Sequence, residues 1–249
     1  MGQVKTNLRL TATIEPFDSF WEAPENIEKG FARFGQFYRR NYLDRLPKNI
    51  ASKVLVISCG YGYFVKLLKD VGYSDVLGID SDPAKVRIAT GKGLNCKVES
   101  AFAFLENPPG SYDVIIAEQE INHLTKEEII LFLDLCRKNL VKGGILLVHS
   151  LNGANPITGS EALAQNFDHY TPLTEYSLRQ ILGHTGFGDV NVFPLNLYVF
   201  YNNPLNYVAL LADRINTLIF RINFLLYGKS NRIFTKKIAA VGKKKDSAG

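Results

Sequence analysis

The feature that most constrains this chain is a β-turn-α-β pattern between residues 54 and 80. An apolar run at 54–57 leads into the glycine turn Ser58-Cys59-Gly60-Tyr61-Gly62, a helical pattern follows at 63–71, and a second apolar run at 76–79 ends in Asp80. Glycine lets the backbone approach a ligand that a Cβ would block, and an acid about 20 residues on can accept hydrogen bonds from ribose hydroxyls. The pattern therefore predicts an adenosine-type ligand at the ends of two parallel strands.

The rest of the chain extends this unit into an α/β protein. Further apolar runs at 96–98, 113–117 and 145–148 alternate with helical patterns, which predicts a parallel sheet covered on both faces. Asp82-Pro83 and the capping box at 125–128 predict two helix starts. A polar connection at 150–172, a helix at 175–182 and strands at 190–201 and 233–241 follow. We expect a helical N-terminal cap at 1–50 and a sheet domain at 51–249.

Composition narrows the class of protein. The chain has 249 residues, of which 46% are hydrophobic, as expected for a globular protein with a sizeable core. Charges interrupt the first thirty residues, so a signal peptide is not predicted. Three widely spaced cysteines suit a reducing cytosol, and we expect a cytoplasmic protein. Basic and aromatic residues do not interleave as in nucleic-acid-binding proteins, so no nucleic-acid partner is expected.

An apolar helical run at 207–226 separates the last two predicted strands, as a helical insert over about 203–228. Asp213, Arg214 and Arg221 lie well inside it, which argues against a helix that spans a bilayer. Two alternatives stay open. The helix packs in the core or against a second copy in a homodimer, or it lies on the inner membrane surface beside the basic C-terminal tail, with the protein peripheral at that membrane. The tail could equally be solvated.

The glycine turn also discriminates between cofactors. A dinucleotide fingerprint needs a third glycine at position 65, where Val65 stands, and no lysine follows as in a phosphate loop. A cofactor with a ribose but no phosphates, S-adenosylmethionine, fits better. Residues 54–62, Asp80 and the turn Leu140-Val141-Lys142-Gly143-Gly144 together resemble a class I S-adenosylmethionine-dependent methyltransferase over about 50–245. The resemblance implies a Rossmann-like sheet, mostly parallel, with a late antiparallel strand.

The same resemblance implies a cofactor site. Asp80 would hold the ribose, Ala101-Phe102 would form an adenine wall, and Glu118 would face the cationic methionine end or begin a helix. The sequence departs from the family at Val56, where an acid is usual, and at Ser58, where the first glycine is usual, so we expect the turn to differ there. The implied cofactor residues are Tyr38, Ser58, Gly60, Gly62, Asp80, Ser81, Ala101, Phe102 and Glu118.

Several further stretches resemble methyltransferases of bacterial cell-surface polysaccharide loci, which modify O-antigen or capsule sugars. This resemblance implies O-methylation of a sugar, nucleotide-sugar or glycan acceptor. The stretches lie at 37–40, 121–128, 152–156, 168–171, 173–180 and 186–187.

A sugar hydroxyl reacts faster if a base removes its proton, and histidine titrates near neutral pH. His123 follows the fourth strand and His169 lies in the polar connection, so both are candidates for the base or for positioning the acceptor. His149 and His184 are weaker candidates.

Asn152 and Asn155 are candidates for binding acceptor hydroxyls, although Asn-Pro is also ordinary turn chemistry. No metal site is expected, while Glu118, Glu120 and His123 keep a metal-dependent version open. Two other functions remain: a methyltransferase for a lipid-quinone precursor or an amine, and a non-catalytic scaffold that binds the cofactor.

Overall fold

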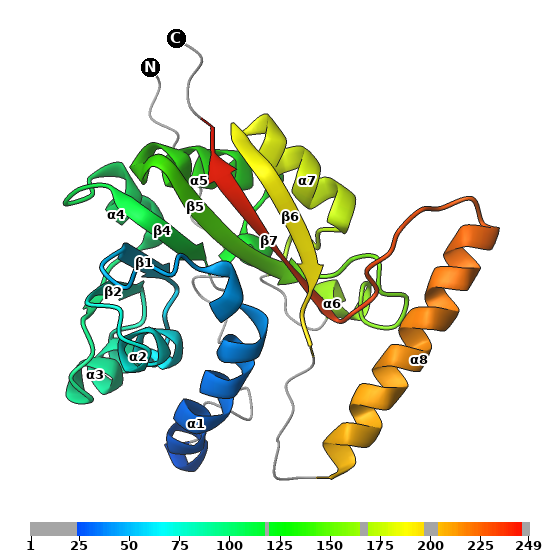
Figure 1. The fold of residues 1–249 in the computed structure, drawn as a ribbon, viewed down its shortest axis with the longest axis horizontal. Helices are drawn as coiled ribbons and strands as arrows, with labels where there is room; N and C mark the ends of the chain where they lie inside the picture. Colours follow the sequence, from blue (N-terminus) through cyan, green and yellow to red (C-terminus); the bar gives the residue numbers. More distant parts are fainter. Residues whose placement is uncertain (1–23, 118–119, 165–168, 197–203, 246–249) are drawn as a thin grey trace.

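The computed structural model describes residues 24–117, 120–164, 169–196 and 204–245. Its centre is a seven-stranded sheet (Figure 1). The strands are β1 (Lys53–Ile57), β2 (Asp75–Asp80), β3 (Cys96–Val98), β4 (Tyr112–Ala117), β5 (Leu140–Leu151), β6 (Phe187–Pro194) and β7 (Lys237–Lys244). They lie in the order β3-β2-β1-β4-β5-β7-β6. The first five are parallel, and β7 is antiparallel to both β5 and β6, so the predicted fold class is confirmed.

Helices cover both faces of this sheet, as the alternation of patterns predicts. One core packs α1, α2 and α3 against the sheet, and the other packs α4, α5 and α7 against the opposite face. Parallel strands buried on both faces explain the continuous apolar runs of β1 and β4. The helices of these layers are α1 (Pro24–Asn41), α2 (Tyr63–Asp70), α3 (Pro83–Gly91), α4 (Ala101–Glu106), α5 (Lys126–Asn139) and α7 (Glu175–His184).

The helix ends follow local sequence rules. The Asp82 side chain accepts the backbone N–H groups of Ala84 and Lys85 at the start of α3. Thr125 and Glu128 form the predicted capping box of α5. Gly72, one residue beyond the C-cap of α2, has a φ of +101° that favours glycine. The two predicted helix starts are confirmed.

The last third of the chain differs from its prediction. Strand β5 runs from Leu140 to Leu151 rather than over 145–148, because Leu140 also pairs with Tyr112 on β4 and residues 149–151 pair with β7. Strand β6 begins at Phe187 and ends at Pro194, whereas 190–201 was expected; residues 197–201 of that prediction lie outside the described residues. A four-residue helix, α6 (Glu161–Ala164), interrupts the polar connection.

The last strand is shifted from its predicted place, 233–241, to Lys237–Lys244. The backbone carbonyls of Ile233, Phe234 and Thr235 accept hydrogen bonds from asparagine side chains instead of from a neighbouring strand. The Glu175 carboxylate accepts the N–H groups of Arg232 and Ile233. These side chains hold residues 232–235 out of the sheet, so the strand begins only after them.

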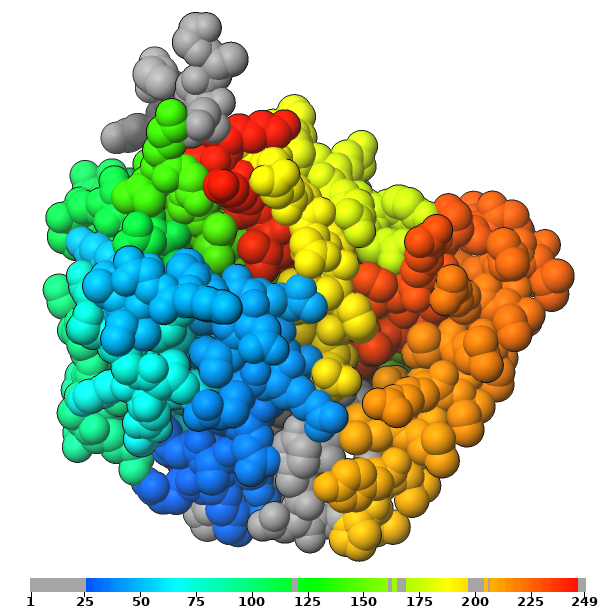
Figure 2. Space-filling view, viewed as in Figure 1, coloured from blue at the N-terminus to red at the C-terminus, as the bar shows by residue number. Residues whose placement is uncertain are grey.

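Helix α8 (Leu205–Leu226) stands at one side of the molecule, beyond β6 and β7, as a ridge in the space-filling view (Figure 2). It corresponds to the predicted insert. Among the described residues, no helix is long and apolar enough to cross a membrane. The division of the chain at residue 50 stays a prediction; α1 packs against α2, with the Tyr38 ring stacked 4.3 Å from that of Phe64.

Candidate functional site

The glycine turn after β1 lies at the carboxyl edge of the sheet, where parallel α/β sheets bind ligands. Gly60 and Gly62 have φ values of +53° and +81°, and Gly62 is the N-cap of α2. A Cβ built on Gly62 would lie 2.7 Å from Leu94, whereas one built on Gly60 would meet nothing within 4 Å. Side chains therefore pack against the turn at Gly62, whereas the turn is open at Gly60. A ligand could approach the backbone at Gly60.

The backbone at Ser58 shows how the turn accommodates a serine where the family usually has glycine. Its φ is +56°, a region that favours glycine and that costs other residues about 1–3 kcal/mol. The backbone at position 58 thus keeps the shape that a glycine would adopt, and the serine side chain is accommodated at a cost in strain.

Asp80 joins the turn to the end of β2. Its Oδ2 accepts the Gly60 N–H at 2.7 Å, and its Oδ1 accepts the Asp82 N–H at 2.9 Å. A carboxylate has about four lone-pair sites, so two remain for hydroxyl donors. The open backbone at Gly60 beside this half-buried acid fits the predicted ribose.

The predicted adenine wall lies next to Asp80. The Glu99 N–H donates to the Asp80 carbonyl at 3.0 Å, and Ala101 and Phe102 begin α4 immediately afterwards. The half-buried Phe102 ring lies 6.0 Å from that of Phe132. Of the remaining cofactor candidates, Ser81 is exposed directly after β2, and Glu118 lies outside the described residues.

Tyr38 lies deeper than predicted. Its side chain is 4% exposed and stacks on Phe64 between α1 and α2. An aromatic ring buried in this way supports the helix pair, and the proposed closure over a cofactor stays a prediction for this residue.

His123 and His169 meet at the same edge, although 46 residues of sequence separate them. Their ring centroids are 4.8 Å apart in an edge-to-face arrangement, and both side chains are half-buried. His123 ends the 3₁₀ helix η3 (Glu120–His123), which follows β4. The two strongest candidates for a base are thus brought into contact.

Asn122 holds this pair in place and is the residue that the sequence reasoning did not single out. Its Oδ1 accepts the Ser150 hydroxyl at 2.9 Å and the Leu151 N–H at 3.0 Å at the end of β5. Its carbonyl accepts the Tyr170 N–H at 2.9 Å, next to His169. The only signal in the sequence is its position beside His123.

His149, predicted as a weaker candidate, lies buried near the end of β5. Its Nδ1 lies 2.9 Å from the Tyr42 hydroxyl, while its buried Nε2 has no hydrogen-bond partner among the described residues. Burial, with a smaller contribution from Lys237, holds the pKa of His149 well below its ordinary value. This histidine is therefore neutral. It follows Val148, which forms the last residue pair between β5 and β4 with Ala117.

Asn152 and Asn155 hold the chain rather than face an open site. Both are buried, and both side-chain amides donate to the carbonyls of residues 233–235. Their Oδ1 atoms accept backbone N–H groups from residues 154, 157 and 158. Because both asparagine side chains already bond to the backbone of this chain, their position argues against the predicted contact with acceptor hydroxyls. His184 is exposed at the end of α7.

Two further features bear on ligands. Among the residues that the structure describes, no group of three or more His, Cys, Asp or Glu side chains could hold a metal ion. A hollow of about 510 Å³ lies at the opposite edge, where β5 begins and β7 ends, and four lysines line it: Lys142, Lys243, Lys244 and Lys245. Part of the chain's excess of basic over acidic residues therefore lies at the edge of the sheet opposite to the glycine turn.

Comparison with known proteins shows which family the sequence matches. The sequence model of a family described as "Methyltransferase domain" matches residues 27–192. Among curated proteins, none matches the sequence significantly.

Solved structures share the fold at low sequence identity. A SAM-dependent methyltransferase from Archaeoglobus fulgidus is 20% identical with a TM-score of 0.67, covering 91% of this chain and 100% of its own. A possible histamine N-methyltransferase from Thermotoga maritima is 16% identical with a TM-score of 0.60, covering 89% and 95%. Phosphoethanolamine N-methyltransferase 2 from Haemonchus contortus, solved with S-adenosyl-L-methionine, is 15% identical with a TM-score of 0.57, covering 94% and 61%.

Proposed function

The chain belongs to the methyltransferase-domain family and is an S-adenosylmethionine-dependent methyltransferase, and on that premise we propose that it methylates a hydroxyl of a sugar, nucleotide-sugar or glycan acceptor. We place this reaction in bacterial surface polysaccharide biosynthesis, in the cytoplasm. The cellular setting rests on the sequence resemblance. The three buried cysteines, none of them in a disulfide, fit a reducing compartment.

The residues at the glycine turn fit the cofactor. Asp80 would accept the ribose hydroxyls, the open backbone at Gly60 would allow close approach, and Ala101 with Phe102 would border the adenine. When bound, the cofactor supplies a methyl group on a sulfonium sulfur, which is a good leaving group. The protein then has two tasks, to align the acceptor oxygen and to take its proton.

The observation that carries the proposed acceptor is the contact between His123 and His169. The two rings come from separate segments, and Asn122 ties both segments to the end of β5. As the acceptor oxygen forms its bond to the methyl carbon, we propose that His169 takes the hydroxyl proton on a ring nitrogen and that His123 orients it. An amine acceptor deprotonated before attack would not need such a base.

The lipid alternative is less well supported. A greasy acceptor would need an apolar site, and the long apolar helix was the sequence feature in its favour. In the structure, the apolar side chains of α8 are largely exposed on the side of the molecule away from the glycine turn. They therefore do not line a pocket for an acceptor beside His123 and His169.

Methyl transfer from radiolabelled S-adenosylmethionine tests the proposal, with nucleotide sugars, glycans, amines and lipid acceptors compared in parallel. We expect turnover on a sugar acceptor, and turnover only on lipids or amines would overturn the acceptor class. Replacing His169 with Ala should lower kcat by about 100-fold, in the range of general-base effects, and leave S-adenosylhomocysteine affinity unchanged.

The matched control is His184→Ala, because that histidine is exposed at the end of α7 and belongs to no part of the proposed site. Its kcat should stay within about twofold of the wild type. An equal kcat for His169→Ala and wild type would remove His169 from the mechanism. Cofactor binding without transfer to any acceptor would favour the non-catalytic scaffold.

A further inference from the structure

Helix α8 has two apolar faces, and the protein covers only one of them. The covered face carries Leu210, Phe220 and Phe224, which are half-buried. The Phe224 ring lies 4.7 Å from that of the fully buried Phe234, which anchors the helix to the segment before β7. This contact joins the helix to the rest of the protein, at whose side it stands (Figure 1).

The other face is an exposed apolar stripe. Its residues recur at alternating spacings of three and four along the whole helix, so they lie on one side of it. At about 100° per residue, this side is opposite to Phe220 and Phe224. The outer stripe, with exposed fractions, is Val208 63%, Leu211 59%, Ile215 51%, Leu218 60%, Ile222 51% and Leu225 71%. A contiguous exposed stripe of this kind marks an interaction surface.

Aromatic residues lie at both ends of the outer stripe. Tyr207 is 56% exposed at its start, and Tyr227 is 85% exposed directly after the helix. Tyrosine has an apolar ring and a polar hydroxyl, which suits the boundary between lipid and water.

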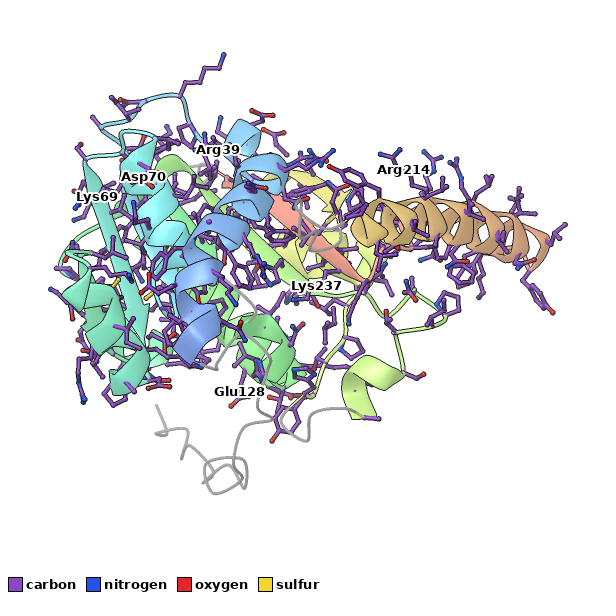
Figure 3. The ribbon with its side chains drawn as sticks, turned by 90° about the horizontal axis from the view of Figure 1, so that it is seen from below. Arg39, Lys69, Asp70, Glu128, Arg214 and Lys237 are labelled. Atoms are coloured by element: carbon purple, nitrogen blue, oxygen red, sulfur yellow. The ribbon has the colours of Figure 1, made fainter. Side chains whose placement is uncertain are left out.

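The charges beside the stripe have one sign. Arg214 and Arg221 are exposed and lie seven residues apart, so both flank the same edge of the stripe, and Figure 3 shows Arg214 projecting from the helix. Asn216 and Asn223 occupy the other flank. The one acid of the helix, Asp213, lies toward the covered face, and burial raises its pKa. Exposed Lys229 and Arg232 follow the helix and add further positive charge.

We propose that α8 docks the enzyme onto an anionic phospholipid surface, with the outer stripe in the headgroup region and the two arginines against lipid phosphates. Charge decides between this partner and a second copy of the chain. An antiparallel pairing of two stripes would bring the arginine flanks together, and a parallel one would set arginines beside asparagines. Neither offers an acid to Arg214 or Arg221, whereas an anionic bilayer does. The proposal stands whichever acceptor the enzyme methylates.

Co-sedimentation of the full chain with lipid vesicles tests this surface. We expect binding to phosphatidylcholine vesicles that contain about one third phosphatidylglycerol, and much weaker binding to pure phosphatidylcholine. Replacing Arg214 and Arg221 with Gln should weaken binding to the anionic vesicles by about fivefold per arginine at low ionic strength. The double variant Leu218→Glu/Ile222→Glu should lower it at least about tenfold, because two charges would enter the apolar layer.

The control variant is Ile130→Glu, which places the same charge on an apolar side chain of α5 that is 40% exposed. It should bind vesicles like the wild type. All variants should keep the wild-type melting temperature and S-adenosylhomocysteine affinity, which would show that the fold and the cofactor site are intact. Equal binding of wild type and Leu218→Glu/Ile222→Glu would overturn the proposal. So would a concentration-dependent dimer, seen by analytical ultracentrifugation, that the same double variant dissociates.

Discussion

Replacing Asp80 with Asn tests the part of the carboxylate that a bound ribose would use. In the structure its two oxygens accept N–H groups from Gly60 and Asp82 at 2.7 and 2.9 Å, and the remaining lone pairs are open to hydroxyl donors. Asparagine keeps one oxygen but loses the charge and turns the other acceptor into a donor. Hydrogen bonds to charged groups contribute about 1.5–3 kcal/mol each. Losing one ribose contact should therefore weaken S-adenosylhomocysteine binding by about 10- to 100-fold.

Isothermal titration calorimetry measures that affinity, and chemical denaturation separates it from stability. We expect the free energy of unfolding to fall by about 1–3 kcal/mol, because a backbone N–H at the turn loses its acceptor. Asp82→Ala is the matched control. It removes the N-cap of α3 two residues away, which should cost about 1 kcal/mol of stability and change the affinity by less than about twofold. A folded Asp80→Asn variant that binds as tightly as the wild type would refute the ribose role.

Two further predictions concern stability. Burial keeps His149 neutral in the folded protein, whereas in the unfolded chain this histidine has its ordinary pKa of 6.5. Below that pH the unfolded chain therefore binds more protons than the folded protein does. The free energy of unfolding should therefore fall by about 1 kcal/mol between pH 7 and about pH 5.5, and a His149→Gln variant measured by urea denaturation should lack that part of the pH dependence. Ser58→Gly should relieve the backbone at φ +56°, but glycine also makes the unfolded chain more flexible, so the free energy of unfolding should rise by only up to about 1 kcal/mol. A lower midpoint of denaturation would contradict the strain.

Local patterns predict most elements between residues 53 and 139 because the structure there depends on near neighbours. Apolar runs, the Asp82 N-cap and the capping box at Thr125 each act within a few residues, and all occur where the sequence places them. The last strand was predicted four residues too early for the opposite reason. Its start depends on Asn152 and Asn155, which hold backbone carbonyls 79 to 83 residues away.

The same distinction holds for the candidate site. The rule that parallel strands end at one edge predicts that Asp80 and His123 share that edge with the turn at Gly60. The contact of His123 with His169 depends on how residues 169–171 fold back onto Asn122. The lowered pKa of His149 depends on its burial in the folded protein, where its Nδ1 lies beside the hydroxyl of Tyr42, 107 residues earlier. No local pattern contains these contacts.

The most direct test of the account is the identity of the atom that receives the methyl group. The full chain is incubated with S-adenosylmethionine labelled with ¹³C in the methyl group and with the best sugar acceptor, and the product is examined by NMR. The account predicts a labelled methyl carbon that correlates through oxygen with a sugar ring carbon, and formation of this product about 100-fold more slowly with His169→Ala. A label attached to nitrogen, or a lipid as the only labelled product, would contradict it.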